Sequence, residues 1–473
     1  MKLRYPVVLV VLLIVGAAPL ARAADQAPRP HVLFLVADDL GWADVSYHDG
    51  EIRTPHIDRL AAAGTRLEQF YVQPVCSPTR SALMTGRYPM RFGIQDPLWP
   101  WSEYGLPLEE RTLAQALREA GYTTSICGKW HLGHYERAYL PTARGFDHQY
   151  GLYLGSIDYF THLREGGLDW HRDDHGCVEE GYSTALLAKE AVRTLDEYDG
   201  KRPLFLYVPF NAVHGPHQVP ESYSEPYKHL PSERRIYAGM VAAMDEAIGQ
   251  IIAAVERNNL GGNTLIFFCS DNGGPNPGVV TSNGPLRDGK GTPYEGGTRV
   301  PALVVWDGKL AKGKIVNEPL HIVDWYPTLL KLAGASTAQK LPIDGLDAWP
   351  TIAQGQPSPH DALLINQAPE GGAVRVGNWK LVITTGRAAG VAPRSSKAQM
   401  KKQKAPAAAI AAAIELFDLA ADPYEKTNLA ESYPDKVRDL QARYAALTAA
   451  AIQPKSHPPT ASYKPPKVWG EPE

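Results

Sequence analysis

Three short apolar runs, at residues 31–37, 203–210 and 265–270, are each followed at once by polar or charged residues. They are rich in β-branched and aromatic side chains, as expected for strands buried on both faces of a sheet. Residues 122–127 are predicted as a further strand. Helical spacing of apolar residues marks the segments 54–70, 112–120 and 237–255. The alternation of strands and helices predicts an α/β fold with a large mixed, mostly parallel sheet between helices.

The pattern changes after a turn at residues 342–345, which we take as the end of a catalytic domain spanning 24–345. Residues 373–384 alternate in polarity around a hairpin turn at Gly377-Asn378, and a strand at 415–419 and a helix at 435–451 follow. These elements predict a smaller C-terminal α+β subdomain, 346–453, built on an antiparallel sheet. We expect a mobile Ala- and Lys-rich insertion near 388–413 and a Pro-rich tail, 454–473, without regular structure.

The first 23 residues have the three parts of a secretory signal peptide. Lys2 and Arg4 form a basic start, residues 7–15 an apolar core, and Ala21-Arg22-Ala23 a cleavage site. A membrane anchor is the alternative, although the apolar run is short for a span. No other segment is expected to cross a bilayer. We therefore expect a periplasmic or secreted protein, cleaved near Ala23 and without a stable membrane anchor.

Composition and cysteine content narrow the picture further. The formal net charge of −3 over 473 residues gives no support for nucleic-acid binding. The length is ample for a large core or two domains. Of the four cysteines, Cys127 and Cys269 lie in strand-like runs and are expected in the core, and we predict no disulfide involving them or Cys177.

Polar side chains follow three of the predicted strands: Asp38-Asp39, His214 and Asp271-Asn272. If the strands are parallel, these groups converge on one edge of the sheet, where open α/β sheets bind ligands. Their oxygen ligands suit a hard cation, Ca²⁺ or Mg²⁺. Taken alone, Asp38-Asp39 also fits a polar turn in which one aspartate caps a helix.

Two further segments carry cations suited to an anionic substrate. Lys129 and His131 project to the same side of an extended chain. Lys290 lies within the glycine-rich stretch 283–301, whose backbone is expected to pack closely or to approach a ligand. A solvated lysine, a core histidine and a flexible surface loop are the alternatives.

The most specific signal is Cys76-Ser77-Pro78-Thr79-Arg80, followed by residues 81–87, Ser-Ala-Leu-Met-Thr-Gly-Arg. Pro78 fits the first turn of a helix, so Cys76 is expected at the helix N-terminus, where backbone N–H groups favour an anion. A buried cysteine at a core helix is the alternative. The C-x-P-x-R spacing resembles the signature of type I sulfatases. Residues 121–133 resemble the second signature of that family and residues 289–292 its Gly-Lys-Gly-Thr loop, and the likeness extends from about His31 to Leu429.

This resemblance implies an alkaline-phosphatase-like fold, hydrolysis of sulfate esters, and conversion of Cys76 to Cα-formylglycine by a maturation enzyme. Asp38, Asp39, Asp271, Asn272 and the modified residue 76 would hold Ca²⁺, or Mg²⁺. Arg80 would position the hydrated aldehyde, and Lys129 and Lys290 would bind sulfate oxygens. His131 would contact the formylglycine and help to break down the sulfated enzyme. His214 would contact the substrate and protonate its leaving oxygen.

Residues 141–147, 154–159, 214–220 and 237–240 resemble the arylsulfatase B-like group, which acts on N-acetylgalactosamine 4-sulfate. The resemblance implies an exo-acting enzyme on a 4-O-sulfated galactose-type sugar, or on an aryl sulfate. Gly215, His217 and Asp288-Gly289 lie where the group varies, so the sugar recognised can differ. Four side chains are candidates for sugar contacts or for packing: Trp99, Trp101, Trp170 and His171.

Two other functions compete with sulfate hydrolysis. A phosphodiesterase or phosphonate monoester hydrolase of the same superfamily can also use formylglycine, but the pattern of Lys129, His131 and Lys290 favours sulfate. A non-catalytic glycan-binding protein would require Cys76 to stay unmodified. So complete a set of metal- and anion-binding groups is hard to explain without catalysis.

Overall fold

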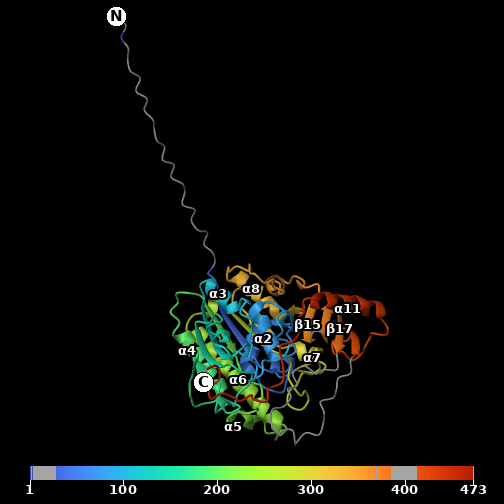
Figure 1. Cartoon of the computed structure of the whole chain (residues 1–473), viewed down its shortest axis with the longest axis horizontal. Coiled ribbons are helices and arrows are strands. Elements are labelled where there is room, and N and C mark those ends of the chain that lie inside the picture. The colour runs from blue at the N-terminus through green and yellow to red at the C-terminus, as the bar shows by residue number, and fades with distance from the viewer. Residues whose placement is uncertain (2, 4–27, 369–370, 385–412, 472–473) are drawn as a thin grey trace.

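The computed structural model describes residues 1, 3, 28–368, 371–384 and 413–471. A ten-stranded mixed sheet forms its centre (Figure 1), with the strand order β13-β2-β12-β11-β1-β10-β4-β5-β8-β9. The strands of this sheet are β1 His31–Ala37, β2 Thr65–Leu67, β4 Thr123–Lys129, β5 His148–Leu152, β8 His171–Arg172, β9 His175–Gly176, β10 Leu204–Pro209, β11 Thr264–Ser270, β12 Ala302–Val305 and β13 Lys314–Val316. Two small sheets pair β3 (Phe70–Tyr71) with β14 (Leu320–His321) and β6 (Leu163–Arg164) with β7 (Gly167–Leu168).

The strands β11, β1, β10, β4 and β5 run parallel to one another. In this register Val32 lies between Phe205 and Leu265. The carboxyl ends of β1, β10 and β11 therefore meet at one edge of the sheet, as the apolar runs predict. The predicted large mixed, mostly parallel sheet is confirmed.

Helices cover both faces of this sheet. Successive strand residues point to opposite faces, so each strand contributes side chains to two cores. Val32, Phe34 and Val36 pack in one core with side chains of α2, α3 and α8. Leu33 and Leu35 pack in a second core with α1, α4 and α6. The ten α-helices assigned within the described residues are α1 Pro55–Ala63, α2 Cys76–Thr85, α3 Leu113–Glu119, α4 Ser183–Asp196, α5 Glu221–Ser224, α6 Ser232–Arg257, α7 Glu295–Thr298, α8 Trp325–Leu332, α9 Trp349–Gln354 and α11 Pro434–Thr448.

One predicted helix is wrong in its second half. α1 ends at Ala63, and the residues expected to continue it form β2 and β3 instead. β2 pairs with β12 and β13, so tertiary hydrogen bonding overrides the local helical pattern. The helix predicted at 112–120 is confirmed as α3, where Thr112 and Gln115 form a reciprocal capping box.

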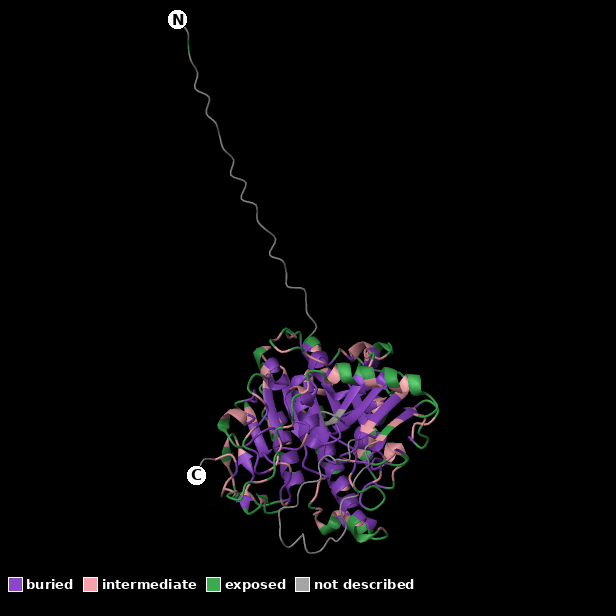
Figure 2. Cartoon of the chain, turned by 45° about the vertical axis from the view of Figure 1, so that its right-hand side comes forward, coloured by how far each residue is buried: buried purple, intermediate pink, exposed green. Residues whose placement is uncertain are grey.

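The C-terminal part forms the predicted antiparallel sheet. Its strands follow the order β15 (Leu363–Ala368), β16 (Gly371–Val376), β17 (Trp379–Thr384) and β18 (Ala413–Asp418), with α11 packed against β16 and β17. The strands of both sheets are largely buried, whereas α11 exposes much of its surface (Figure 2). β15 is absent from the sequence prediction. The predicted insertion near 388–413 and the signal peptide 1–23 fall almost wholly outside the described residues, and the domain boundaries stay predictions.

α6 is long and apolar enough to cross a membrane, which the sequence analysis did not anticipate. Within its most hydropathic stretch 78% of the residues are buried inside the protein. Its apolar side chains include Met240, Met244, Ile248 and Ile251, which pack in the core on one face of the sheet. Core packing therefore accounts for the hydropathy of this helix.

Candidate active site

Cys76 is the first residue of α2, as predicted from its spacing to Pro78, and its preceding residue Val75 is extended. The side chain is 3% exposed. Burial raises the pKa of the Cys76 thiol, while the nearby ammonium groups of Lys129 and Lys290 act in the opposite direction. An anionic group formed at this position would face both cations and the free N–H groups of the first helical turn.

The polar residues that follow β1 and β11 come together beside this helix. Asp39 has a left-handed φ of 65°, and its backbone N–H donates to Asp271 Oδ1 at 3.3 Å. Asn272 Nδ2 donates to Asp39 Oδ1 at 2.7 Å. Asp38, Asp39, Asp271 and Asn272 are all buried. The structure thus gathers the four predicted metal ligands contributed by these two strand ends.

Three cations, the buried Arg80 and Lys129 and the partly buried Lys290, balance the three carboxylates. The Arg80 guanidinium donates to Asp271 Oδ2 from Nη2 at 2.7 Å and from Nε at 3.1 Å. Lys129 Nζ donates to Asp38 Oδ2 at 2.5 Å, and Lys290 Nζ lies 2.6 Å from Asp39 Oδ1. Arg80 also donates to the backbone oxygen of Lys129 at 3.1 Å. The two predicted sulfate-binding lysines and Arg80, predicted to position the aldehyde, therefore form one network with the carboxylates.

The two aspartates after β1 have different electrostatic surroundings. Burial and the neighbouring Asp271 charge raise the pKa of Asp38 to about 7. Burial also acts to raise the pKa of Asp39, but Lys290 and His214 outweigh it and hold that pKa below its ordinary value. Asp39 is therefore the more strongly acidic of the pair.

Each of the two predicted catalytic histidines has one ring nitrogen fixed by a backbone carbonyl. His131 Nε2 donates to the oxygen of Leu98 at 2.8 Å, and His214 Nδ1 donates to that of Gly215 at 2.6 Å. Burial, aided by the nearby lysines, lowers the pKa of His214 to about 3 and that of His131 well below its usual range. The basic nitrogens are consequently His131 Nδ1 and His214 Nε2, and the latter lies 3.6 Å from Asp39 Oδ2.

The donor set fits a hard divalent cation. Asp38 Oδ1 and Asn272 Oδ1 are buried, and neither has a hydrogen-bond partner among the described residues. Ligand atoms of Asp38, Asp39 and His214 lie within 4.8 Å of one another. Carboxylate and amide oxygens are the ligands that Ca²⁺ and Mg²⁺ prefer. Buried oxygens without partners are costly unless a ligand uses them, so their presence supports a metal at this point.

The four candidate sugar contacts divide into two pairs. Trp170 and His171 are fully buried and stack in the core on His162 and Tyr153, so they are packing residues. Trp99 and Trp101 stack on each other beyond Leu98, which the sequence analysis did not single out. The Leu98 backbone oxygen accepts the hydrogen bond from His131 Nε2, and its backbone N–H donates to Ser77 Oγ at 3.0 Å. A backbone contact of this kind leaves no signal in residue type.

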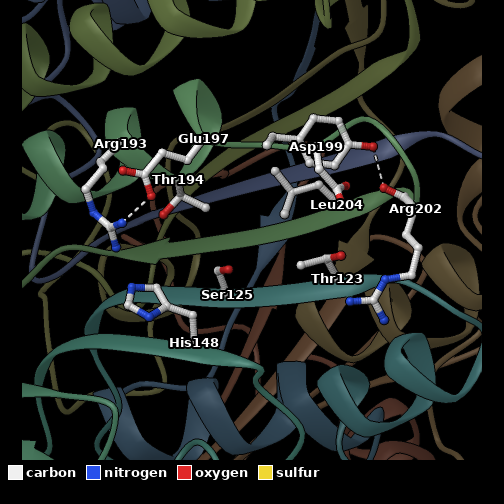
Figure 3. Close-up of a pocket in the computed structure, with 10 residues that line it drawn as sticks. Thr123, Ser125, His148, Arg193, Thr194, Glu197, Asp199, Arg202 and Leu204 are labelled. Carbon is white, nitrogen blue, oxygen red and sulfur yellow. Dashed lines mark hydrogen bonds and ion pairs between the residues drawn. The ribbon is translucent and has the colours of Figure 1, made fainter.

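A separate hollow of about 320 Å³ lies at the opposite edge of the sheet, where Thr123 and Leu204 begin β4 and β10 (Figure 3). Its cations are already engaged by acidic partners: Arg193 bonds Glu197, and His148 Nε2 lies 2.8 Å from Glu190 Oε1. None of the predicted site residues lines it. The predicted site residues therefore gather at the carboxyl edge and not in this hollow.

Comparison with known proteins agrees with this geometry. A sulfatase family profile matches residues 30–335. Arylsulfatase J of Mus musculus is 38% identical over 480 residues, covering 93% of this chain and 80% of that protein. N-acetylgalactosamine-6-sulfatase of Canis lupus familiaris is 35% identical over 373 residues, covering 73% of this chain and 70% of that protein.

Solved structures place the fold. The crystal structure of Ps i-CgsB in complex with k-i-k-neocarrahexaose superposes with a TM-score of 0.80 at 31% identity, covering 90% of this chain and 94% of that one. A phosphonate monoester hydrolase of Agrobacterium radiobacter superposes with a TM-score of 0.62 at 22% identity, covering 90% of this chain and 96% of that one. At that identity the second likeness shows the fold alone.

The alkaline-phosphatase-like fold and the buried cluster of acids and cations at its sheet edge define an enzyme that hydrolyses esters of a tetrahedral oxyanion. The chain belongs to the sulfatase family. It is a sulfuric ester hydrolase, as the two signatures predict. The finer likeness to the arylsulfatase B-like group is not established by these matches.

Proposed function

We propose that this sulfatase removes sulfate from the end of a sulfated saccharide, with formylglycine at position 76 and Ca²⁺, or Mg²⁺, in the site. The observation that carries the proposal is the convergence of Cys76 with the buried network of Asp38, Asp39, Asp271, Lys129 and Lys290. Formylglycine, once formed and hydrated, supplies a hydroxyl nucleophile. Asp38, Asp39, Asp271, Asn272 and residue 76 would hold the metal, which would supply positive charge near the negatively charged sulfuryl oxygens.

The chain's own side chains complete the reaction. Lys129 and Lys290 bind the sulfate oxygens and stabilise their charge. Arg80, held by Asp271 and by the Lys129 carbonyl, positions residue 76. His131 accepts a proton at Nδ1, because its Nε2 is committed to Leu98. His214 protonates the leaving oxygen from Nε2, since Nδ1 is held by Gly215. Nε2 must first take up a proton, and the Asp39 carboxylate 3.6 Å away favours that protonated form.

For the substrate we propose a 4-O-sulfated galactose or N-acetylgalactosamine. The stretches at 141–147 and 214–220 that resemble the arylsulfatase B-like group support position 4. Among the relatives, Ps i-CgsB was solved with a neocarrahexaose, and the enzyme from dog is named for the 6-sulfate of N-acetylgalactosamine. These names support a sulfated galactose-type sugar and leave positions 4 and 6 to be separated by experiment.

The test is sulfate release from defined saccharides sulfated at single positions, using protein co-expressed with a formylglycine-generating enzyme and checked for the aldehyde by mass spectrometry. Cys76→Ala is the control. Release from 4-O-sulfated sugars alone is expected. Release only from other positions overturns the proposed position but keeps the carbohydrate substrate. Absence of sulfate release, together with turnover of a phosphate diester or phosphonate ester, overturns the proposed reaction.

A further inference from the structure

The C-terminal segment 452–471, called here the C-terminal strap, crosses loops that flank the active site. It contains no helix or strand, yet hydrogen bonds fix it at both ends. Ile452 N donates to Met90 O at 3.0 Å, and Lys455 N donates to Gly93 O at 3.1 Å. At the far end Trp469 N donates to Leu168 O at 2.9 Å. Figure 1 shows that the C-terminus lies near α4 and α6, on the opposite side of the view from α11.

The C-terminal strap closes a cavity of about 570 Å³. The opposite wall comes from the loop around Trp101 and from the chain after His131. Its lining combines aromatic rings with exposed groups of both charges: Trp101, Glu103, Tyr135, Tyr463, Lys464 and Trp469. The volume lies within the range of small-molecule sites. Such a lining offers flat apolar faces together with hydrogen-bond donors and acceptors.

Two of the rings form a fixed corner. Trp101 stacks on Trp99 with ring centroids 5.6 Å apart and planes 11° apart, and Tyr463 meets Trp101 edge-on at 6.0 Å and 74°. Trp101 Nε1 donates to His457 O at 2.7 Å, and the Tyr463 hydroxyl donates to Glu165 Oε2 at 2.9 Å. A ligand entering this corner meets rings that are already oriented, which lowers the entropic cost of binding.

Two segments of the cavity wall follow closely in the chain on residues of the active site: Trp101 follows Leu98, and His134 follows His131. Leu98 contacts both Ser77, the neighbour of Cys76, and His131 through its backbone. Two residues further on, the Pro100 oxygen accepts a hydrogen bond from His134 Nε2 at 3.0 Å. Trp101 follows Pro100, so it lies within roughly 10 Å of Leu98 along the chain. The cavity wall therefore comes within three residues of Leu98, whose backbone oxygen holds the catalytic His131.

We propose that this cavity is a saccharide subsite for the sugar units that adjoin the sulfated sugar, a proposal that rests on the carbohydrate substrate proposed above. Sugar rings present C–H faces that pack on Tyr135, which is 58% exposed, and on Tyr463, which the buried Trp101 supports edge-on. Their hydroxyls both donate and accept, which matches a wall holding the Glu103 carboxylate and the Lys464 ammonium. The strap thereby adds specificity for a saccharide chain over a single sulfated sugar.

The test compares two substrates on wild-type enzyme and on Tyr463→Ala. One is a sulfated monosaccharide and the other a tetrasaccharide that ends in the same sulfated sugar. Loss of the ring should lower kcat/KM for the tetrasaccharide roughly tenfold, chiefly through KM, and leave the monosaccharide within about twofold. Tyr433→Ala, which removes a tyrosine 48% exposed beside Trp379, is the matched control and should change neither.

A second measurement does not depend on turnover. The unsulfated tetrasaccharide is titrated calorimetrically into the Cys76→Ala protein and into the same protein carrying Tyr463→Ala, with equal Tm values confirming an intact fold. Binding that weakens roughly tenfold in the second protein supports the subsite. Equal binding, or an equal loss on both substrates in the kinetic test, overturns it. Absence of sulfate release from either substrate overturns the proposed function, whereas the titration still decides the subsite.

Discussion

Two clusters of buried charge share the same molecule but use their atoms differently. In the active site, Asp38 Oδ1, Asn272 Oδ1 and His131 Nδ1 are buried with no hydrogen-bond partner among the described residues. In the second cluster, Lys380 Nζ lies 2.8 Å from both Glu295 Oε1 and Glu425 Oε1. Both clusters contain ion pairs, but only the first also has ligand atoms with neither a hydrogen bond nor an ion pair among the described residues; in the second, Glu425 Oε1 lacks a hydrogen bond yet lies against the Lys380 ammonium.

The second cluster joins chain segments instead of building a site. Glu295 begins α7 and accepts a hydrogen bond from the Tyr71 hydroxyl of β3 at 2.8 Å. Its backbone N–H donates to Glu425 Oε2 at 2.7 Å, and Lys380 belongs to β17. The C-terminal sheet is thereby fixed to a helix that starts five residues after Lys290. Buried charge alone therefore does not mark an active site; unpartnered ligand atoms beside a nucleophile do.

The largest expected effect comes from removing the nucleophile. Cys76→Ala should lower sulfate release by at least about a thousandfold, because every later step depends on that residue. Stability should change little, since a small buried side chain is exchanged for a smaller one. Activity assays and thermal melts on the same preparation measure both. Retained turnover in Cys76→Ala would show that the active-site cluster acts without its proposed nucleophile.

Removal of the metal should have the second largest effect on activity. Treatment with a chelator should reduce kcat by roughly a thousandfold, because the cation stabilises charge on the sulfuryl oxygens. Adding Ca²⁺ or Mg²⁺ back should restore activity and raise Tm by mass action. At a free metal concentration a hundred times Kd, the unfolding free energy should increase by about 2.7 kcal/mol. Asp39→Asn should abolish the Tm rise and Lys380→Met should keep it. A rise that survives in Asp39→Asn places the metal elsewhere.

A matched pair of lysines separates the two clusters directly. Lys290→Met should lower kcat/KM by roughly a hundredfold through loss of an anion-binding charge. Lys380→Met should cost about 3–5 kcal/mol of stability, because two buried carboxylates lose their counter-charge. Denaturant unfolding and steady-state kinetics on both variants give the comparison. If Lys380→Met left unfolding unchanged, the second cluster would not hold the C-terminal sheet to α7.

The smallest effect is a pH dependence of stability. Burial, with the charge of Glu295, raises the pKa of Glu425 from its ordinary 4.5 to about 7. The folded state therefore binds more protons than the unfolded state between these values, so this group's contribution to the unfolding free energy falls as pH rises from about 4.5 to 7. Glu425→Gln should flatten that decline. Exposed Glu431→Gln is the control, and parallel pH curves for wild type and Glu425→Gln would contradict the shift.

The parts of the site that the sequence predicted are those set by local rules. Asp38-Asp39 and Asp271-Asn272 follow buried strands, and parallel strands bring their carboxyl ends together. The spacing of Cys76 and Pro78 was enough to place the cysteine at a helix N-terminus. Each of these inferences needs only a strand, a helix start and one topological rule.

The parts that the sequence did not predict depend on distant segments. Lys380 and Glu295 lie 85 residues apart, and nothing in either stretch signals the pair. The tail from residue 454 lacks helical or strand periodicity, yet it lines the cavity beside Trp101. Trp99 and Trp170 looked equivalent as lone aromatics until packing separated them. The local sequence pattern determines which segments form helices and strands, whereas these contacts depend on how the helices and strands are assembled.

The burial of Cys76 bears on the order of events during biosynthesis. A cysteine residue that is 3% exposed at the start of a packed helix is out of reach of another protein's active site. If position 76 is oxidised to an aldehyde, the oxidation must take place while this stretch of chain is still unfolded. Molecules that fold first would keep their thiol permanently. The yield of working enzyme would then be set by a race between oxidation and folding in the newly made chain, and supplying the oxidising enzyme later would not raise it.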